Sequence, residues 1–138
     1  MIFLQEPLST DPKLLNPLTL AYMGDAVLEV YVRHHLIAKK GAKPHLLHRM
    51  ATHYVSAKAQ SKVLLILQEE LTEDERWMVK RGRNTKSGTV PKNADIMEYR
   101  NSSGLECLLG YLYLTGNQER LNRLIQTMFT IIETEEKA

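Results

Sequence analysis

The chain has 138 residues, of which 43% are hydrophobic and 25% are charged, and its net charge is +2. This composition excludes a disordered chain, and the length provides for a single domain over residues 1–138 without room for a second of ordinary size. The single cysteine, Cys107, excludes an internal disulfide and a cysteine-rich zinc site, and the apolar stretches are too short to span a bilayer, so we expect a cytoplasmic protein.

Helical periodicity dominates the chain, and no segment shows the alternation of a strand, so we expect an all-α protein, a compact helical bundle. Asn16 and Pro17 have the character of an N-cap and a first helical residue, ahead of a long helix over 18–39 that ends near Gly41. A capping box at Thr72 opens a later helix. Further helices are predicted over 44–50, 56–70, 73–80, 103–114 and 117–132.

Residues 82–94 are rich in glycine, proline and asparagine and are predicted to form a loop of about a dozen residues. Loops of this length are uncommon in compact domains and are usually functional or mobile. The stretch 76–92 contains no acidic residue but carries the basic residues Arg76, Lys80, Arg81, Arg83, Lys86 and Lys92. A basic segment in a nearly neutral chain indicates a polyanionic partner. A solvated loop that happens to be basic is the alternative.

Asp25 stands in the middle of the helix over 18–39, which has two apolar sides and few positions open to water. We therefore expect a buried carboxylate, which needs a partner or a metal ion. Its helical neighbours include no basic residue, and the adjacent Gly24 predicts the close approach of another backbone. A salt bridge to a distant arginine, or a position at a partly wet edge, is the alternative for Asp25.

Glu106 lies in the predicted helix 103–114, on the same face as Gly110. Ser103 and Glu106 have the spacing of a capping box, which by itself would explain the glutamate. If instead two helices cross at Gly24 and Gly110, Asp25 and Glu106 would flank a hard cation such as Mg²⁺, which typically takes one or two protein carboxylates. The five histidines also raise zinc as a possibility, but no HExxH pattern or cysteine pair accompanies them.

The segments 20–29, LAYMGDAVLE, and 104–114, GLECLLGYLYL, are the most informative stretches of the chain. They resemble the signature helix and the second catalytic segment of the ribonuclease III family, in the same order and at a similar spacing. The resemblance extends over about residues 14–132, which we expect to be the catalytic core. Residues 16–17 and 81–84 are similar to the compact Mini-III form, and the chain ends one helix after the second segment, so we expect no appended double-stranded-RNA-binding domain.

The resemblance implies an all-α endonuclease domain that forms a homodimer through the helix 18–39 and cleaves double-stranded RNA with Mg²⁺. It assigns Asp25 and Glu106 as the catalytic residues and metal ligands. It also implies products with a 5′-phosphate, and structured precursor ribosomal RNA of the large subunit as the substrate. Full-length members carry supporting acids where this chain has Leu18, Ala21 and Ser103, so the number of bound metal ions stays open.

Duplex RNA is bound through its phosphates and 2′-hydroxyls, so basic side chains are the candidates for RNA binding. Without an accessory domain, the segment 76–92 must provide much of this binding, together with a residue close to the second catalytic segment. The candidates are Lys80, Arg81, Arg83, Lys86, Lys92 and Arg100. A family member kept for RNA or ribosome binding without catalysis is the alternative, and the retention of Asp25 and Glu106 favours the enzyme.

Overall fold

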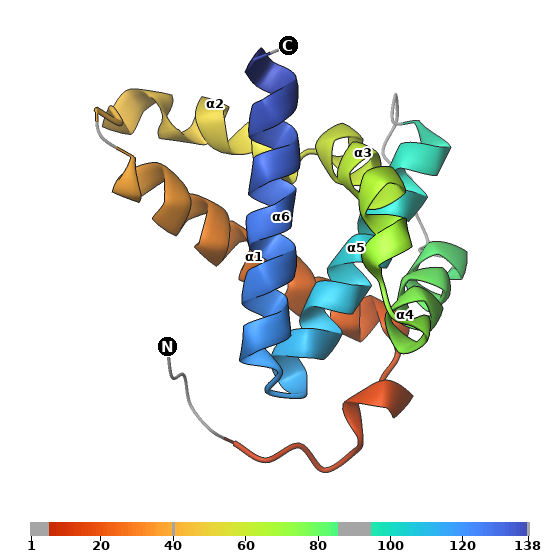
Figure 1. Ribbon diagram of the computed structural model, residues 1–138. Helices are drawn as coiled ribbons and strands as arrows, with labels where there is room; N and C mark the ends of the chain where they lie inside the picture. Colours follow the sequence, from red (N-terminus) through yellow and green to blue (C-terminus); the bar gives the residue numbers. More distant parts are fainter. Residues whose placement is uncertain (1–5, 40, 86–94, 138) are drawn as a thin grey trace.

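The computed structural model describes residues 6–39, 41–85 and 95–137, and within these ranges all regular structure is helical (Figure 1). The all-α prediction is therefore confirmed. The α-helices are α1 (Pro17–Ala38), α2 (Pro44–Val55), α3 (Ala57–Leu67), α4 (Glu73–Asn84), α5 (Ile96–Leu114) and α6 (Gln118–Lys137), and the short 3-10 helices are η1 (Pro12–Leu14) and η2 (Gln68–Glu70). Among these residues we find no helix with the length and apolar character of a membrane span.

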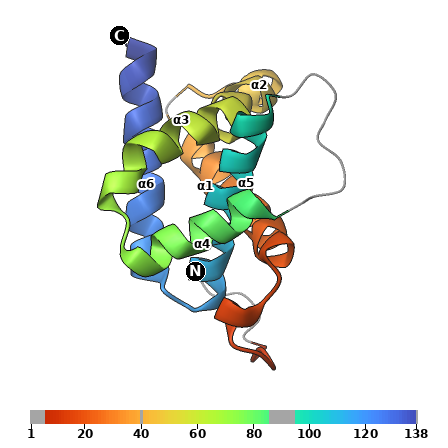
Figure 2. The ribbon, with the colours of Figure 1, turned by 90° about the vertical axis from the view of Figure 1, so that its right-hand side faces the viewer.

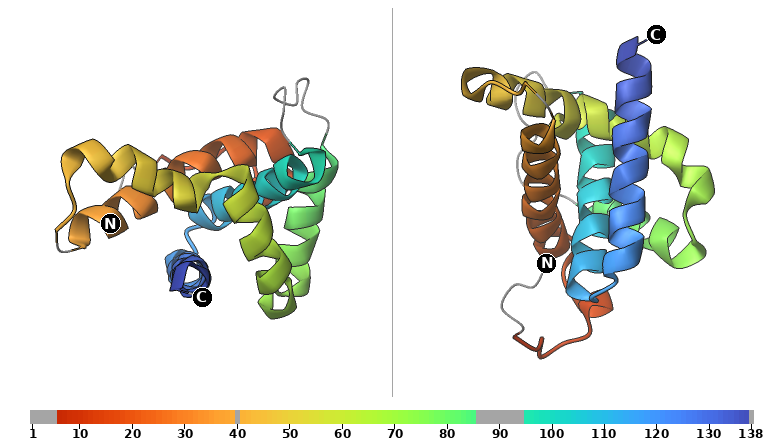
Figure 3. Two further views of the ribbon diagram at one scale, coloured as in Figure 1. Left: turned by 90° about the horizontal axis from the view of Figure 1, so that it is seen from above. Right: turned by 60° about the vertical axis from the view of Figure 1, so that its left-hand side comes forward.

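Helix α5 is the centre of the fold and contacts α1, α3, α4 and α6. In Figure 1, α2 and the end of α1 lie on one side of the molecule and α3 and α4 on the other, and Figure 3 shows α5 between α1 and α6. The view in Figure 2 brings α3 and α4 to the front. Leu105, Leu108 and Leu109 are fully buried, because α5 carries apolar residues around most of its circumference and can be covered on several sides at once.

The predicted helix starts at Asn16 and Thr72 are confirmed. The Asn16 side chain accepts a hydrogen bond of 2.8 Å from the Leu18 backbone N–H, and Pro17 is the first residue of α1. At α4, the Glu75 N–H donates to the Thr72 hydroxyl while the Thr72 N–H donates to the Glu75 carboxylate, so both halves of the capping box are made. These contacts join neighbours in the chain, and local sequence therefore predicts them.

Two predicted boundaries around the 82–94 loop are wrong. Helix α4 continues to Asn84, so Gly82 is helical, and α5 begins at Ile96, seven residues before the expected start. Asp95 caps α5 by accepting from the Glu98 N–H at 3.0 Å, so Ser103 lies inside the helix and no capping box is formed at Glu106. The rest of the predicted loop, with Lys86 and Lys92, lies outside the described residues. Helix α2 also extends five residues beyond its predicted end, to Val55.

Four glycines allow α5 to be crossed closely by two other helices. A Cβ atom at Gly24 of α1 would lie 1.7 Å from the Glu106 carbonyl oxygen, and one at Gly110 of α5 would lie 1.9 Å from the Leu20 carbonyl oxygen. At the crossing of α4 and α5, a Cβ at Gly82 would lie 2.8 Å from the Cα of Gly104. Gly82 thus serves helix packing, which explains why interpreting it as a helix breaker was wrong.

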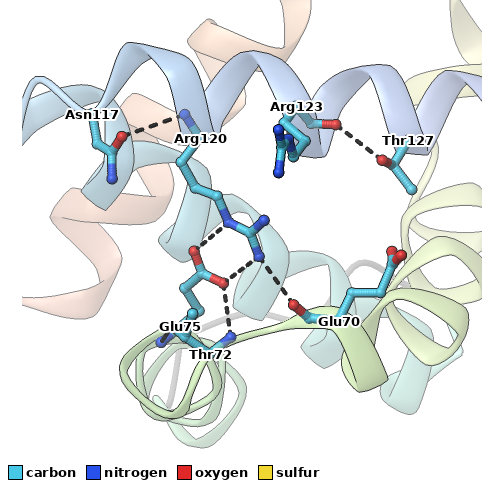
Figure 4. Close-up of polar contacts among 7 residues, drawn as sticks. All are labelled: Glu70, Thr72, Glu75, Asn117, Arg120, Arg123 and Thr127. Carbon is cyan, nitrogen blue, oxygen red and sulfur yellow. Dashed lines mark hydrogen bonds and ion pairs between the residues drawn. The ribbon is translucent and has the colours of Figure 1, made fainter.

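The start of α6 is tied to the start of α4 by a bidentate ion pair (Figure 4). The Arg120 guanidinium donates to both carboxylate oxygens of Glu75 at 2.8 Å and to the Glu70 carbonyl oxygen at 3.1 Å. Burial by itself raises the pKa of Glu75, but its bonds from Arg120 and Thr72 outweigh burial and leave this pKa below its usual value. A buried charge is thereby fully paired, which makes this contact a structural clamp.

Candidate active site

The crossing of α1 and α5 brings two carboxyl groups from distant parts of the chain together. Gly24 rests against the backbone of Glu106, as the close approach predicted from this glycine requires. Asp25 follows Gly24 directly, and its carboxyl group lies close enough to that of Glu106 to raise the pKa of Glu106. Since Ser103 makes no cap here, the alternative explanation of Glu106 as a capping residue no longer applies.

The two carboxyl groups differ in their surroundings. Glu106 is partly buried, and this burial, together with the nearby Asp25, raises its pKa to about 8, although a hydrogen bond from Gln60 opposes the shift. A raised carboxyl pKa means that ionisation is unfavourable unless a cation is present. Asp25 and Glu106 lie side by side, and the ionised form of Glu106 is unfavourable without a cation. The pair therefore forms a site suited to a positive charge.

Asp25 itself is exposed in the single chain, so the expectation that it is buried is wrong. Both apolar sides of α1 are covered in its second half, where Val32 and Leu36 are buried, but the first half is open, and Leu18 and Tyr22 there are 40% and 81% exposed. A helical wheel identifies two apolar sides without saying which of them its own chain covers. The consequence is a site with one acid open to solvent and one set into the protein.

The donor set of the crossing fits Mg²⁺. Nowhere in the described residues do three or more His, Cys, Asp or Glu side chains gather in a way that could hold a metal ion. Magnesium commonly uses only one or two protein carboxylates and keeps several water molecules, which the pair Asp25 and Glu106 can satisfy. Glu29, one turn further along α1, accepts a hydrogen bond from Arg33 at 3.3 Å.

The basic candidates fall into separate groups. Lys80 and Arg100 are exposed, and Arg83 is partly buried. Lys80 and Arg83 line an open groove of about 490 Å³ between η2 and α4, together with Arg76, which the prediction left out of the RNA-binding set. This arrangement places three basic side chains along one face of α4, beside the acidic Glu69, and the Arg76 guanidinium donates to the Gln68 carbonyl oxygen at 3.1 Å.

Arg81 has a different role from these neighbours. Its guanidinium donates to the carbonyl oxygens of Lys13 and Leu15 at 2.8 and 2.9 Å, and it stacks on the Trp77 ring with its centre 4.8 Å away. These contacts hold the segment before α1 against α4. Arg81 therefore offers few free donors to a ligand, unlike Lys80 on the same helix.

Gln60 is a residue that the sequence analysis missed. It is only 1% exposed, and its amide nitrogen donates to the Glu106 carboxylate at 3.2 Å and to the Val55 carbonyl oxygen at 2.9 Å. One signal was present in the sequence, because Gln60 is a polar residue on the helical face that Val63 and Leu64 continue into the core.

Comparison with known proteins identifies the family of the chain. The Ribonuclease III domain model matches residues 18–117. The Mini-ribonuclease 3 of Brevibacillus brevis is 53% identical over 131 residues, which cover 95% of this chain and 98% of the relative, and that of Enterococcus faecalis is 52% identical over 130 residues, which cover 92% and 98%. A crystal structure of a protein from Fusobacterium nucleatum superposes with a TM-score of 0.79 at 29% identity, covering 92% of this chain and 99% of that protein. The chain therefore belongs to the ribonuclease III family of endoribonucleases, and within it is similar to the Mini-ribonuclease 3 proteins.

Proposed function

We propose that this protein is a magnesium-dependent endoribonuclease that hydrolyses double-stranded RNA, with Asp25 and Glu106 as its metal ligands. The observation that carries the proposal is the glycine-mediated crossing of α1 and α5, which holds these two carboxyl groups side by side. The resemblance to Mini-III enzymes supports precursor ribosomal RNA of the large subunit as the natural substrate, and the region 14–132 as one catalytic domain.

The chain's own residues prepare the site for hydrolysis. Asp25 is open to solvent, where an RNA phosphate can reach it, while Glu106 sits deeper and must give up its proton before it can act as a ligand. Magnesium would supply a water of lowered pKa and neutralise charge on the phosphate oxygens. We expect direct hydrolysis without a covalent intermediate, which leaves a 5′-phosphate and a 3′-hydroxyl.

Duplex RNA would be held by its phosphates on the basic face of α4. Lys80, Arg83 and Arg76 line one groove there, and Arg100 lies in the first half of α5. Lys86 and Lys92 remain candidates in the segment between these helices. The charged face suits a ligand that is recognised by shape and backbone, as double-stranded RNA is.

The outward face of α1 supports a homodimer. Leu18, Tyr22 and Val30 are exposed there, and Val30 also lines an apolar cavity of about 170 Å³ with Met23 and Tyr31. Exposed apolar patches on a small protein mark interaction sites. A second copy, related by a two-fold axis, would cover both patches equally and direct two active sites at one duplex.

A cleavage assay on duplex RNA tests the proposal. Wild-type protein should cut with Mg²⁺ and stop when the metal is chelated, while Asp25→Asn and Glu106→Gln should remain folded and fail to cut. Asp74→Asn, which alters an exposed carboxylate in the first turn of α4, is the matched control and should cut normally. Wild-type rates in Asp25→Asn would show that the site is assigned wrongly. Wild-type protein that binds the duplex without cutting it would favour a non-catalytic RNA-binding protein instead.

A further inference from the structure

Gln60 makes a polar contact to the active site from inside the core. Its side chain is 1% exposed, and its amide nitrogen donates to the Glu106 Oε2 atom at 3.2 Å and to the Val55 carbonyl oxygen at 2.9 Å. It therefore links the end of α2 and the start of α3 to a carboxyl group on α5. Glutamine is seldom buried this completely unless its polar atoms have partners.

The orientation of the Gln60 amide follows from its neighbours. Both contacts are acceptors, a carbonyl oxygen and a carboxyl oxygen, so the amide nitrogen must face them. The amide oxygen Oε1 then has no hydrogen-bond partner anywhere in the described part of the chain. A buried acceptor without a donor is unfavourable, so the missing partner of Oε1 needs an explanation.

A donor from outside the chain would satisfy this oxygen. Oε1 belongs to the same amide group whose nitrogen contacts the Glu106 carboxyl group. The water molecules around a bound Mg²⁺ are hydrogen-bond donors, and Mg²⁺ retains several of them. Meanwhile, the bond from Nε2 reaches Oε2 of Glu106 and not the other carboxyl oxygen.

We propose that Gln60 is a positioning residue of the metal site, which orients the Glu106 carboxylate through its N–H and accepts a hydrogen bond from metal-bound water through Oε1. The inference rests on the proposed function, because it takes Asp25 and Glu106 as the ligands. Partners behind the direct ligands fix the orientation of those ligands, and removing such a partner commonly weakens metal binding about 10- to 100-fold.

The test compares two substitutions at neighbouring positions of α3. Gln60→Met keeps the length and apolar volume of the side chain but removes both polar atoms. Ser61→Ala is the matched control, because Ser61 is also buried and accepts a hydrogen bond of 2.8 Å from Asn101 without touching Glu106. Calorimetric titration of the full chain with magnesium chloride, in the absence of RNA, measures metal affinity independently of cleavage.

Gln60→Met should bind Mg²⁺ about 10- to 100-fold more weakly, and thermal unfolding in the absence of metal shows that the variant is folded. Its half-saturating Mg²⁺ concentration for cleavage should rise by a similar factor, while the rate at saturating Mg²⁺ should change much less. Ser61→Ala should have a lower melting temperature than the wild type and an unchanged affinity for Mg²⁺.

A folded Gln60→Met variant with wild-type metal affinity would overturn the inference and leave the proposed function standing. If this variant does not fold, nuclear magnetic resonance of the labelled wild type tests the inference instead. The signal of the Gln60 side-chain amide should then shift on addition of Mg²⁺. The absence of such a shift, while the signals around Asp25 respond, would overturn the inference. A wild type that does not bind Mg²⁺ at all would overturn the proposed function, and this inference with it.

Discussion

Replacing Gly24 with alanine tests whether the close crossing of α1 and α5 sets the geometry of the two carboxylates. The new Cβ would lie 1.7 Å from the Glu106 carbonyl oxygen and 2.9 Å from the Gly110 nitrogen. Since real Cβ atoms essentially never come within 3.0 Å of a neighbour, the crossing must open by at least 1.3 Å, the difference between 3.0 and 1.7 Å. The obstacle is backbone, so no side-chain movement can relieve it.

The expected loss of stability is moderate, and the expected loss of activity is large. Overpacking of this kind costs about 1–3 kcal/mol, and alanine returns about 1 kcal/mol through its helix propensity. A net loss of roughly 0–2 kcal/mol corresponds to a melting temperature lower by at most about 8 °C in a chain of this size. By contrast, a displacement of about 1 Å between catalytic groups can reduce the rate about 100-fold.

Single-turnover cleavage of duplex RNA at saturating Mg²⁺, together with thermal unfolding, measures both effects. Gly116→Ala is the control, because Gly116 has a φ of 78° with open space around it, after the far end of α5. Alanine should cost about 1–2 kcal/mol there through left-handed strain, but it leaves the carboxylates in place. A Gly24→Ala variant that cuts at the wild-type rate, or an equal loss of activity in Gly116→Ala, would refute the reasoning.

Three further outcomes follow from the structure. Arg120→Ala should destabilise the protein by about 3–5 kcal/mol in thermal unfolding, because it leaves the buried Glu75 charge unpaired, and a loss below about 1 kcal/mol would contradict the clamp. Because the pKa of Glu106 is raised to about 8, the metal-free protein should lose stability as pH rises from the unfolded value of 4.5 towards 8. Added Mg²⁺ must displace this proton, so it should raise the melting temperature more at about pH 8.5 than at about pH 6, and equal shifts would count against Glu106 as a ligand. Tyr22→Lys places a charge on the outward face of α1 and should convert the proposed dimer to monomers in light scattering, whereas an unchanged dimer would place the interface elsewhere.

The sequence by itself determined the helical class and most helix positions, and it provided the two acids that we propose as metal ligands. Asn16 and Thr72 mark helix starts because capping bonds join residues two or three positions apart, and such short-range chemistry is visible in a linear pattern. The motif around Asp25 and Glu106 was also recognisable as a family pattern before any coordinates. The glycines beside these acids indicated close helix contacts, which the crossing of α1 and α5 confirms.

Only the tertiary structure decided which groups meet. Gly82 has the character of a helix breaker in isolation, yet it lies inside α4 because Gly104 of α5 packs against it. Gln60 donates a hydrogen bond to Glu106, 46 residues away in the sequence, and Arg81 donates to the Lys13 carbonyl oxygen, 68 residues away. The side of α1 that carries Asp25 is covered at Val32 and Leu36 but open at Leu18, and this partial cover leaves Asp25 in solvent. The glycines indicate where helices come close, but the partners of Gln60 and Arg81 depend on how all the helices are arranged, which no local pattern of residues encodes.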